Sequence, residues 1–213
     1  MERIVCVLIG YVFGLIQTGY LYGKTQHVDI RKQGSGNAGT TNALRTLGWK
    51  AGAVTFLGDC FKCVAAVVLV YFLFGRTDPE MFPVYAMYAG MGAVMGHNYP
   101  FYMNFKGGKG IAATAGLIVS TTNVWIVLIC LCVFLGIVAG RRYVSLGSLA
   151  VVIVYFLSVV VYGQMGGFGV TGGHLYEIYA VAALLVLSAF YKHKENIKRL
   201  LSGTENKISV GKK

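Results

Sequence analysis

Charged residues are scarce in this sequence, and acidic residues are the scarcest. Charged side chains make up 13% of the chain, whereas a typical soluble domain has about 25%. With 8 Asp and Glu among 213 residues, a Mg²⁺-dependent kinase or nuclease is disfavoured, because such enzymes hold their metal with oxygen ligands. A zinc site is disfavoured too, because Cys60 and Cys63 have no second Cys pair or His beside them. We therefore expect no metal and no cofactor.

Long apolar runs are abundant instead. Hydrophobic residues make up 56% of the chain, and its mean hydropathy is +0.63. A membrane span needs about 20 apolar residues, and clear runs of roughly this length lie at residues 4–22, 50–74, 82–99, 144–162 and 174–191. The first run lacks an Ala-x-Ala cleavage site, so we interpret it as a retained span and not as a signal peptide. The region 107–140 predicts either one long tilted helix or two short helices broken at residues 121–123.

The distribution of Lys and Arg decides between these alternatives. With two helices in that region the chain has about seven transmembrane helices and an outside N-terminus, and only Arg3 and Arg76 then lie outside, with Lys62 inside a span. The positive-inside rule favours this arrangement, and it explains the net charge of +11 without nucleic acid. We therefore predict an all-α polytopic membrane protein, a single domain of residues 1–213. Its basic cytoplasmic tail begins at about residue 192 and could also contact anionic lipid headgroups.

The first cytoplasmic loop carries the sequence GSGNAGTTN. It matches the G-x-G-x-x-G pattern, but no βαβ unit surrounds it, so we reject a dinucleotide-binding fold. An elaborate cap for the next helix is an alternative, yet the density of small polar residues exceeds what a cap needs. Glycine N–H groups, hydroxyls, amides and a forked guanidinium are suited to phosphate. The predicted ligands are Ser35, Gly36, Asn37, Thr41, Asn42 and Arg45.

The second cytoplasmic loop, GHNYPFYMNFKGGKG, follows an apolar run and precedes small residues that suit a helix start. Glycines and a helix N-terminus attract anions through free N–H groups, which favours a phosphate cradle; a basic turn at the membrane surface is the alternative. It is not a Walker A loop, because Gly110 follows Lys109 where Ser or Thr is required. His97 has either a structural or a direct chemical role. The predicted phosphate ligands are Lys106, Gly107, Gly108, Lys109 and Gly110.

Asp59 and Lys62 form a pair of charges, three residues apart, inside the second span. Charges at that depth are costly and are usually paired or functional. One interpretation is a mutual ion pair that fixes helix packing. The other is a wall of the binding site, in which Lys62 attracts an anion.

The third loop and the tail add further polar candidates. Ser145 and Ser148 follow a basic pair and belong either to the site or to a helix cap at the membrane edge. His193, Asn196 and Arg199 recur every three residues and share one side if the last helix continues into the cytosol; a solvated basic tail is the alternative. Glu205 follows as a further candidate.

Four motifs in order resemble the bacterial acyl-phosphate:glycerol-3-phosphate acyltransferases. They are GSGNAGTTN with Arg45, GHNYPFYMNFKGGKG with Thr114, VSLGS, and HKENIKRLLSGTE, and they span nearly the whole chain. The resemblance implies transfer of a fatty acyl group from acyl phosphate to the 1-hydroxyl of glycerol 3-phosphate. The products would be lysophosphatidic acid and phosphate, in the first step of bacterial phospholipid synthesis. Members lack the His-x₄-Asp motif, as this chain does. Cys63 departs from the usual Gly, and Thr40 from the usual Ala or Val.

The resulting hypothesis places the active site at the cytosolic interface of the bacterial cytoplasmic (inner) membrane. His193 and Asn196 orient the glycerol hydroxyl, and its proton goes to a substrate phosphate or to a histidine, His193 or His97. The expected partners are acyl phosphate, glycerol 3-phosphate and membrane lipid, with the protein active as a monomer. Phosphate groups are assigned to Ser35, Arg45, Lys109 and Ser148. The expected catalytic residues are Lys109, Ser148, His193 and Asn196.

A transporter of organic phosphates is the runner-up function. Glycine-broken segments would then form a site at the membrane midplane. However, the polar motifs gather on one face, whereas alternating access needs polar groups through the membrane. A structural or lipid-binding protein would leave the glycine loops unexplained.

Overall fold

The structure, a computed structural model, describes residues 1–208, and within that range it contains helices and no strands. The all-α class is therefore confirmed for this part of the chain. Lys212 and Lys213, predicted to belong to the basic tail, lie outside the described residues. The α-helices are α1 (Glu2–Gly14), α2 (Thr18–Thr25), α3 (Thr40–Leu47), α4 (Trp49–Val70), α5 (Phe82–Asn98), α6 (Ile111–Thr121), α7 (Val124–Arg141), α8 (Val144–Gln164), α9 (Gly172–Lys192) and α10 (Lys194–Leu201). The shorter elements are η1 (Ile30–Lys32), η2 (Tyr71–Gly75) and η3 (Phe101–Met103).

Within residues 1–208, five helical segments are long and apolar enough to cross a membrane. Two other helices of the bundle are shorter than the ~20 residues that a full crossing needs: α5 has 17 residues, and the apolar α6 has 11. The five long segments are Glu2–Thr25, Trp49–Gly75, Val124–Arg141, Val144–Gln164 and Gly172–Lys192.

The predicted break at residues 121–123 is confirmed. Helix α6 ends at Thr121, and α7 begins at Val124. The side chain of Asn123 accepts a hydrogen bond from the backbone N–H of Ile126 at 3.0 Å, which is a standard N-cap. The region therefore contains two helices and not one.

The first predicted span, residues 4–22, is confirmed within the apolar segment Glu2–Thr25, but its helix breaks between Gly14 and Thr18. The break frees the carbonyl of Ile16, which accepts a hydrogen bond from Lys62 Nζ at 2.6 Å. Gln17 Nε2 donates to the carbonyl of His97 at 3.0 Å. The apolar run gives no sign of this break, because the groups that stabilise it come from α4 and α5.

Glycines let α1 and α5 approach until their backbones touch. A Cβ built on Gly10 would lie 1.9 Å from the carbonyl oxygen of Ala89, and one on Gly96 would lie 2.2 Å from that of Tyr11. Gly14 and Gly92 repeat this pattern one turn away on each helix. Spacing of small residues every four positions is typical of closely packed membrane helices.

Replacing Gly10 with alanine should therefore separate α1 from α5 and lower the free energy of unfolding by about 2–3 kcal/mol, an apparent Tm decrease of roughly 5–10 °C. Gly136→Ala on α7 is the matched control, because a Cβ there has nothing within 4 Å. The control should leave stability unchanged or raise it by up to ~1 kcal/mol. Thermal unfolding of both variants in one detergent checks this; equal stabilities would contradict it.

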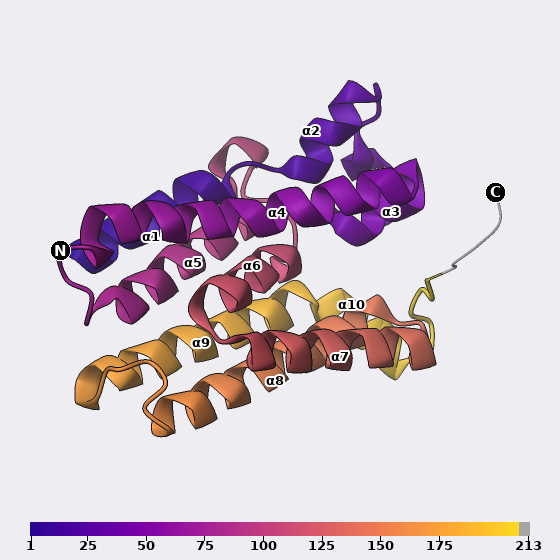
Figure 1. The fold of residues 1–213 in the computed structure, drawn as a ribbon. Coiled ribbons are helices and arrows are strands. Elements are labelled where there is room, and N and C mark those ends of the chain that lie inside the picture. Colours follow the sequence, from indigo (N-terminus) through magenta and orange to yellow (C-terminus); the bar gives the residue numbers. More distant parts are fainter. Residues whose placement is uncertain (209–213) are drawn as a thin grey trace.

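The helices form two groups, and the loops that connect them lie at the two ends of the bundle (Figure 1). Helices α1, α4 and α5 lie together on one side, α7, α8 and α9 on the other, and α6 between them. The larger core joins the groups through side chains such as Met87, Leu117, Tyr155, Val159 and Ile178. Helices α2, α3 and α10 gather at one end of the bundle, opposite the N-terminus (Figure 1).

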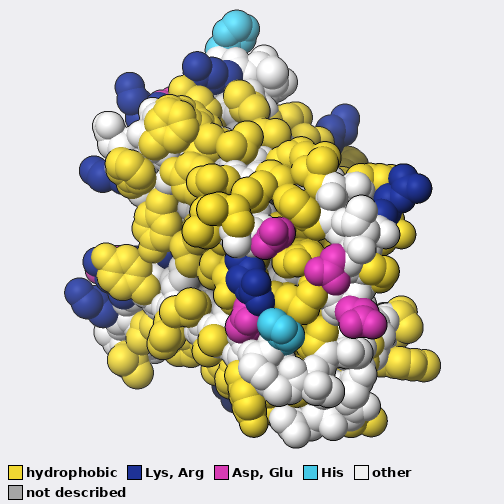
Figure 2. Space-filling model, turned by 90° about the vertical axis from the view of Figure 1, so that its left-hand side faces the viewer, with side chains coloured by type: hydrophobic (Ala, Val, Ile, Leu, Met, Phe, Trp, Pro, Cys, Tyr) yellow, Lys and Arg dark blue, Asp and Glu magenta, His cyan; other side chains and the backbone are white. Residues whose placement is uncertain are grey.

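The end of the bundle at the N-terminus carries a small ionic cluster. Arg3 Nε lies 2.6 Å from Glu177 Oε2, and His174 Nδ1 lies 3.1 Å from Glu177 Oε1. Figure 2 views this end, where acidic side chains gather near the centre of a mostly apolar surface. The cluster ties the start of α1 to the start of α9.

Candidate active site

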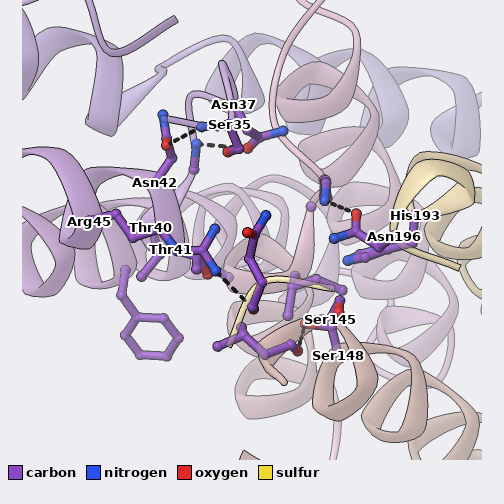
Figure 3. Close-up of a pocket in the computed structure, with 18 of the residues that line it drawn as sticks. Ser35, Asn37, Thr40, Thr41, Asn42, Arg45, Ser145, Ser148, His193 and Asn196 are labelled. Atoms are coloured by element: carbon purple, nitrogen blue, oxygen red, sulfur yellow. Dashed lines mark hydrogen bonds between the residues drawn. The ribbon is translucent and has the colours of Figure 1, made fainter. Parts of the chain in front are cut away.

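A cavity of about 210 Å³ lies at the end of the bundle where α2, α3 and α10 gather. Figure 3 shows Ser35, Asn37 and Asn42 together on one side of it and His193 with Asn196 on another. Its apolar lining consists of Phe56, Ile111, Ala112, Phe134 and Val144. The cavity is therefore built from segments that are far apart in the sequence.

Most of the residues predicted as site residues line this cavity. They are Ser35, Asn37, Thr41, Asn42, Arg45, Asp59, His97, Lys109, Gly110, Ser145, Ser148, His193, Asn196 and Glu205. The predicted residues that do not line it are Gly36, Lys62, Lys106, Gly107 and Gly108. The lining also includes Asn206, which the sequence does not indicate, and Thr40, one of the hydroxyls of the GSGNAGTTN motif.

Three helices start at the cavity without a side-chain cap. The N-cap residues of α3, α6 and α8 are Gly39, Gly110 and Tyr143, and none of them makes a capping hydrogen bond through its side chain. The first N–H groups of a helix have no intrahelical partner and attract anions. Thr40 Oγ1 and Ser145 Oγ, in two of these first turns, are buried without a hydrogen-bond partner among residues 1–208. This end of the bundle is suited to negatively charged ligands.

The Gly34–Asn42 loop is held in shape by Asn42. Its Oδ1 accepts from the N–H of Ser35 at 2.9 Å, and its Nδ2 donates to the carbonyls of Ile30 and Gln33 at 2.9 and 3.0 Å. Gly34 has a φ of +57°, and a Cβ there would lie 2.3 Å from Asn42 Oδ1. These contacts stabilise the loop conformation that leads into the uncapped start of α3.

The glycines of the second loop pack against the end of α5. The N–H groups of Gly107 and Gly108 donate to the carbonyls of Asn98 and His97 at 3.2 and 3.1 Å. A Cβ on Gly108 would lie 2.0 Å from His97 Nε2. These glycines allow close packing around His97, and the exposed side chain of Lys106 lies outside the cavity.

Lys109 is the cation that this loop brings to the cavity. Its Nζ donates to Asn196 Oδ1, and Asn196 Nδ2 donates to Glu205 Oε1 at 2.9 Å. Arg199 Nε donates to Glu205 Oε2 at 2.9 Å. Burial of the Lys109 side chain lowers its pKa to about 8. The nearby Glu205 carboxylate acts in the opposite direction and raises the pKa.

His193 lies at the junction of α9 and α10. The last helix does not continue unbroken, because α9 ends at Lys192 and α10 begins at Lys194. The carbonyl of Ala189 lies 2.8 Å from His193 Nδ1 and can only accept, so Nδ1 carries the proton and Nε2 is left as an acceptor. Burial first, and then the charge of Lys109, lowers the pKa of His193 to about 4. The imidazole is therefore neutral at pH 7.

The predicted ion pair is present and forms part of a buried network. Lys62 Nζ lies 2.8 Å from Asp59 Oδ1 and 2.8 Å from His97 Nδ1. Asp59 and His97 line the cavity, whereas Lys62 lies behind them. The network therefore fixes helix packing and contributes two side chains to the cavity wall.

The segment after α10 passes along the cavity. Arg45 Nη2 donates to the carbonyl of Asn206 at 3.3 Å. The N–H of Ile208 donates to the carbonyl of Arg142 at 2.8 Å, and Arg142 Nε donates back to the carbonyl of Ile208 at 3.1 Å. The end of the described chain is thus attached both to α3 and to the α7–α8 connection.

Comparison with known proteins identifies the family. A family model described as glycerol-3-phosphate acyltransferase matches residues 4–203. The chain belongs to the glycerol-3-phosphate acyltransferase family. Similar members include those of Clostridioides difficile (strain 630), 41% identical over 98% of this chain and 97% of the relative, and Thermoanaerobacter sp. (strain X514), 37% identical over 98% and 96%.

Two solved structures of an acyltransferase of this family share the fold. They are crystal structures of PlsY (YgiH), described as an integral membrane glycerol 3-phosphate acyltransferase, in a glycerol 3-phosphate form and a lysophosphatidic acid form. The TM-scores are 0.83 and 0.81, at 32% identity, over 98% of this chain and 96% of theirs. Together with the five apolar segments, this match shows that the present acyltransferase is a multi-pass membrane protein.

Proposed function

We propose that the protein transfers a fatty acyl group from acyl phosphate to the 1-hydroxyl of glycerol 3-phosphate, giving lysophosphatidic acid and inorganic phosphate. This reaction is the first step of phospholipid synthesis in the bacterial inner membrane. The observation that carries the proposal is the meeting of three uncapped helix N-termini with Arg45 and Lys109 at one cavity. Both substrates are phosphate monoanions or dianions, and such a site can hold both.

The apolar lining supports a lipid-like donor. Phe56 and Phe134 come from α4 and α7, and Ile111 and Ala112 from the first turn of α6. These side chains share the lining with the polar groups, so the cavity offers apolar surface for an acyl chain as well as groups that bind phosphate. A reaction that joins a membrane-dissolved donor to a water-soluble acceptor needs both kinds of surface.

The proposed reaction forms one bond to the acyl carbon and breaks another. The 1-hydroxyl oxygen attacks the acyl carbonyl carbon, the bond from that carbon to the phosphate oxygen breaks, and phosphate leaves. Helix N–H groups and Lys109 stabilise the negative charge on the oxyanion and on the departing phosphate. His193 Nε2 accepts a hydrogen bond from the hydroxyl and orients it. With a pKa of about 4, His193 is a weak base, so the proton goes to a substrate phosphate.

We infer seven membrane crossings, with the N-terminus outside and the cavity at the cytosolic end. The support is charge, because most Lys and Arg fall in the tail and in the loops and helix ends next to the cavity, whereas Arg3 starts α1 and Arg76 follows η2, at the opposite end. Helix α6, about 16 Å long, is shielded from lipid by its neighbours, since Ala113 and Leu117 are fully buried. The whole chain, residues 1–213, acts as one domain and as a monomer, because α3 to α8, α10 and the segment after it contribute to one cavity within a single chain.

The pH dependence should report the ionisation of Lys109. Because the ammonium form binds phosphate, kcat/KM for glycerol 3-phosphate should fall as pH rises through about 8, the pKa of Lys109 in the free protein. In Lys109→Arg the fall should disappear below pH 10, because guanidinium stays charged. Rates measured from pH 6 to 10 for both proteins check this. If kcat/KM still falls near pH 8 in Lys109→Arg, the ionisation belongs to another group.

The proposed function is tested with purified protein in detergent or lipid. Palmitoyl phosphate and glycerol 3-phosphate are supplied with a chelator, and phosphate release and lysophosphatidic acid are measured, with palmitoyl-CoA as donor in parallel. We expect product from palmitoyl phosphate alone. Absence of product from either donor, with protein shown to be folded, would overturn the proposal.

A further inference from the structure

The carboxylate of Asp59 uses one oxygen for the protein and leaves the other without a partner. Oδ1 accepts from Lys62 Nζ at 2.8 Å and from Thr18 Oγ1 at 3.1 Å. Oδ2 is buried and has no hydrogen-bond partner among the described residues. Asp59 is 1% exposed and lines the cavity. A buried carboxylate oxygen without a donor is costly, so the wall is incomplete without a ligand.

Lys62 cannot supply the missing donor. Its three N–H groups are directed to Asp59 Oδ1, to His97 Nδ1 at 2.8 Å and to the carbonyl of Ile16 at 2.6 Å. These three acceptors come from α4, α5 and the α1–α2 break, so Lys62 fixes the carboxylate in one orientation. Since Asp59 lines the cavity, a molecule bound there can supply the donor that Oδ2 lacks.

The type of donor follows from the surroundings. A second anionic group would be repelled by the carboxylate, whereas a neutral hydroxyl can donate to it. The phosphate is held elsewhere, at the helix N-termini, Arg45 and Lys109, and the hydroxyl that is acylated is assigned to His193 and Asn196. The remaining donor on a glycerol phosphate is its 2-hydroxyl.

We propose that Asp59 Oδ2 accepts a hydrogen bond from the 2-hydroxyl of glycerol 3-phosphate and so selects a polyol phosphate among phosphate monoesters. The inference rests on the proposed function and adds a specificity residue to it. His97 lines the same cavity as Asp59. Its Nδ1 accepts a hydrogen bond from Lys62, so its Nε2 carries the proton.

The test compares two acceptors that differ only in this hydroxyl. 3-Hydroxypropyl phosphate keeps the phosphate and the hydroxyl to be acylated and lacks the 2-hydroxyl. With palmitoyl phosphate as donor, the wild-type protein should have a kcat/KM for glycerol 3-phosphate about 10- to 100-fold above that for the analogue. In Asp59→Asn this ratio should fall to about 3 or less, because an amide bonds the hydroxyl less strongly than a carboxylate.

Two further variants keep the test decisive. Thr18→Val removes a hydrogen bond to Oδ1 but leaves Oδ2 in place, so its ratio should stay at the wild-type value. If Asp59→Asn does not fold, the double variant Asp59→Leu/Lys62→Met removes both charges together and avoids a lone buried ion. It should also lose the discrimination.

The outcomes separate the two proposals. A wild-type ratio near 1, or a ratio that stays at the wild-type value in Asp59→Asn while both rates fall equally, would overturn the role of Asp59 and leave it structural. Failure of the wild-type protein to acylate glycerol 3-phosphate from either donor would overturn the proposed function instead.

Discussion

Replacing Lys109 with methionine is expected to lower kcat/KM for glycerol 3-phosphate by about 10²- to 10³-fold. Methionine keeps the apolar stem, so the loop packs as before, but it removes the positive charge next to Asn196 and the start of α6. A preorganised cation in a half-buried site acts on phosphate more strongly than one in water. Both KM and kcat should change, because the charge binds the substrate phosphate and stabilises the departing one.

Lys106→Met is the comparison variant for this prediction. Lys106 lies three residues earlier in the same loop, but its side chain is exposed and does not line the cavity. We expect its kcat/KM to stay within about 5-fold of the wild-type value. Equal losses in the two variants would contradict the geometry and restore the sequence expectation that both lysines bind phosphate.

The helices could be predicted well because the membrane dictates their lengths. Apolar runs of about 20 residues predict spans directly, and Asn123 signals the start of α7 because its side chain caps that helix. The break at residues 15–17 could not be predicted. It is stabilised by Lys62 and His97, which are far away in the sequence and act only after α1, α4 and α5 have packed.

The meeting of the glycine-rich loops at one end of the bundle could be predicted, but not which of their residues face the cavity. Glycine-rich basic loops on one membrane face indicated a phosphate site, and those loops do meet at one cavity. Which groups face inward depends on tertiary packing. Gly107 and Gly108 direct their N–H groups to α5, whereas Thr40 and Asn206 reach the cavity. Sequence patterns did not distinguish these cases.

Arg45→Ala is expected to lower kcat/KM for glycerol 3-phosphate by about 10²-fold, mainly through KM. Arg45 lies in the last turn of α3, five residues after Thr40, and its side chain lines the same cavity as Thr40 and Thr41. Its guanidinium donates to the carbonyl of Asn206 at 3.3 Å, a neutral acceptor at an exposed position. A phosphate offers two charged oxygens to the same fork, so the guanidinium should exchange this carbonyl for the substrate.

That exchange distinguishes arginine from a simple positive charge. Arg45→Lys keeps the charge but loses the fork, so it should recover about 10-fold of the activity lost in Arg45→Ala and no more. Arg31→Ala is the control, because Arg31 is paired with Asp29 at 2.8 Å and does not line the cavity; its kcat/KM should change less than about 3-fold. Full activity in Arg45→Lys would show that Arg45 acts by charge alone, and full activity in Arg45→Ala would remove it from the site.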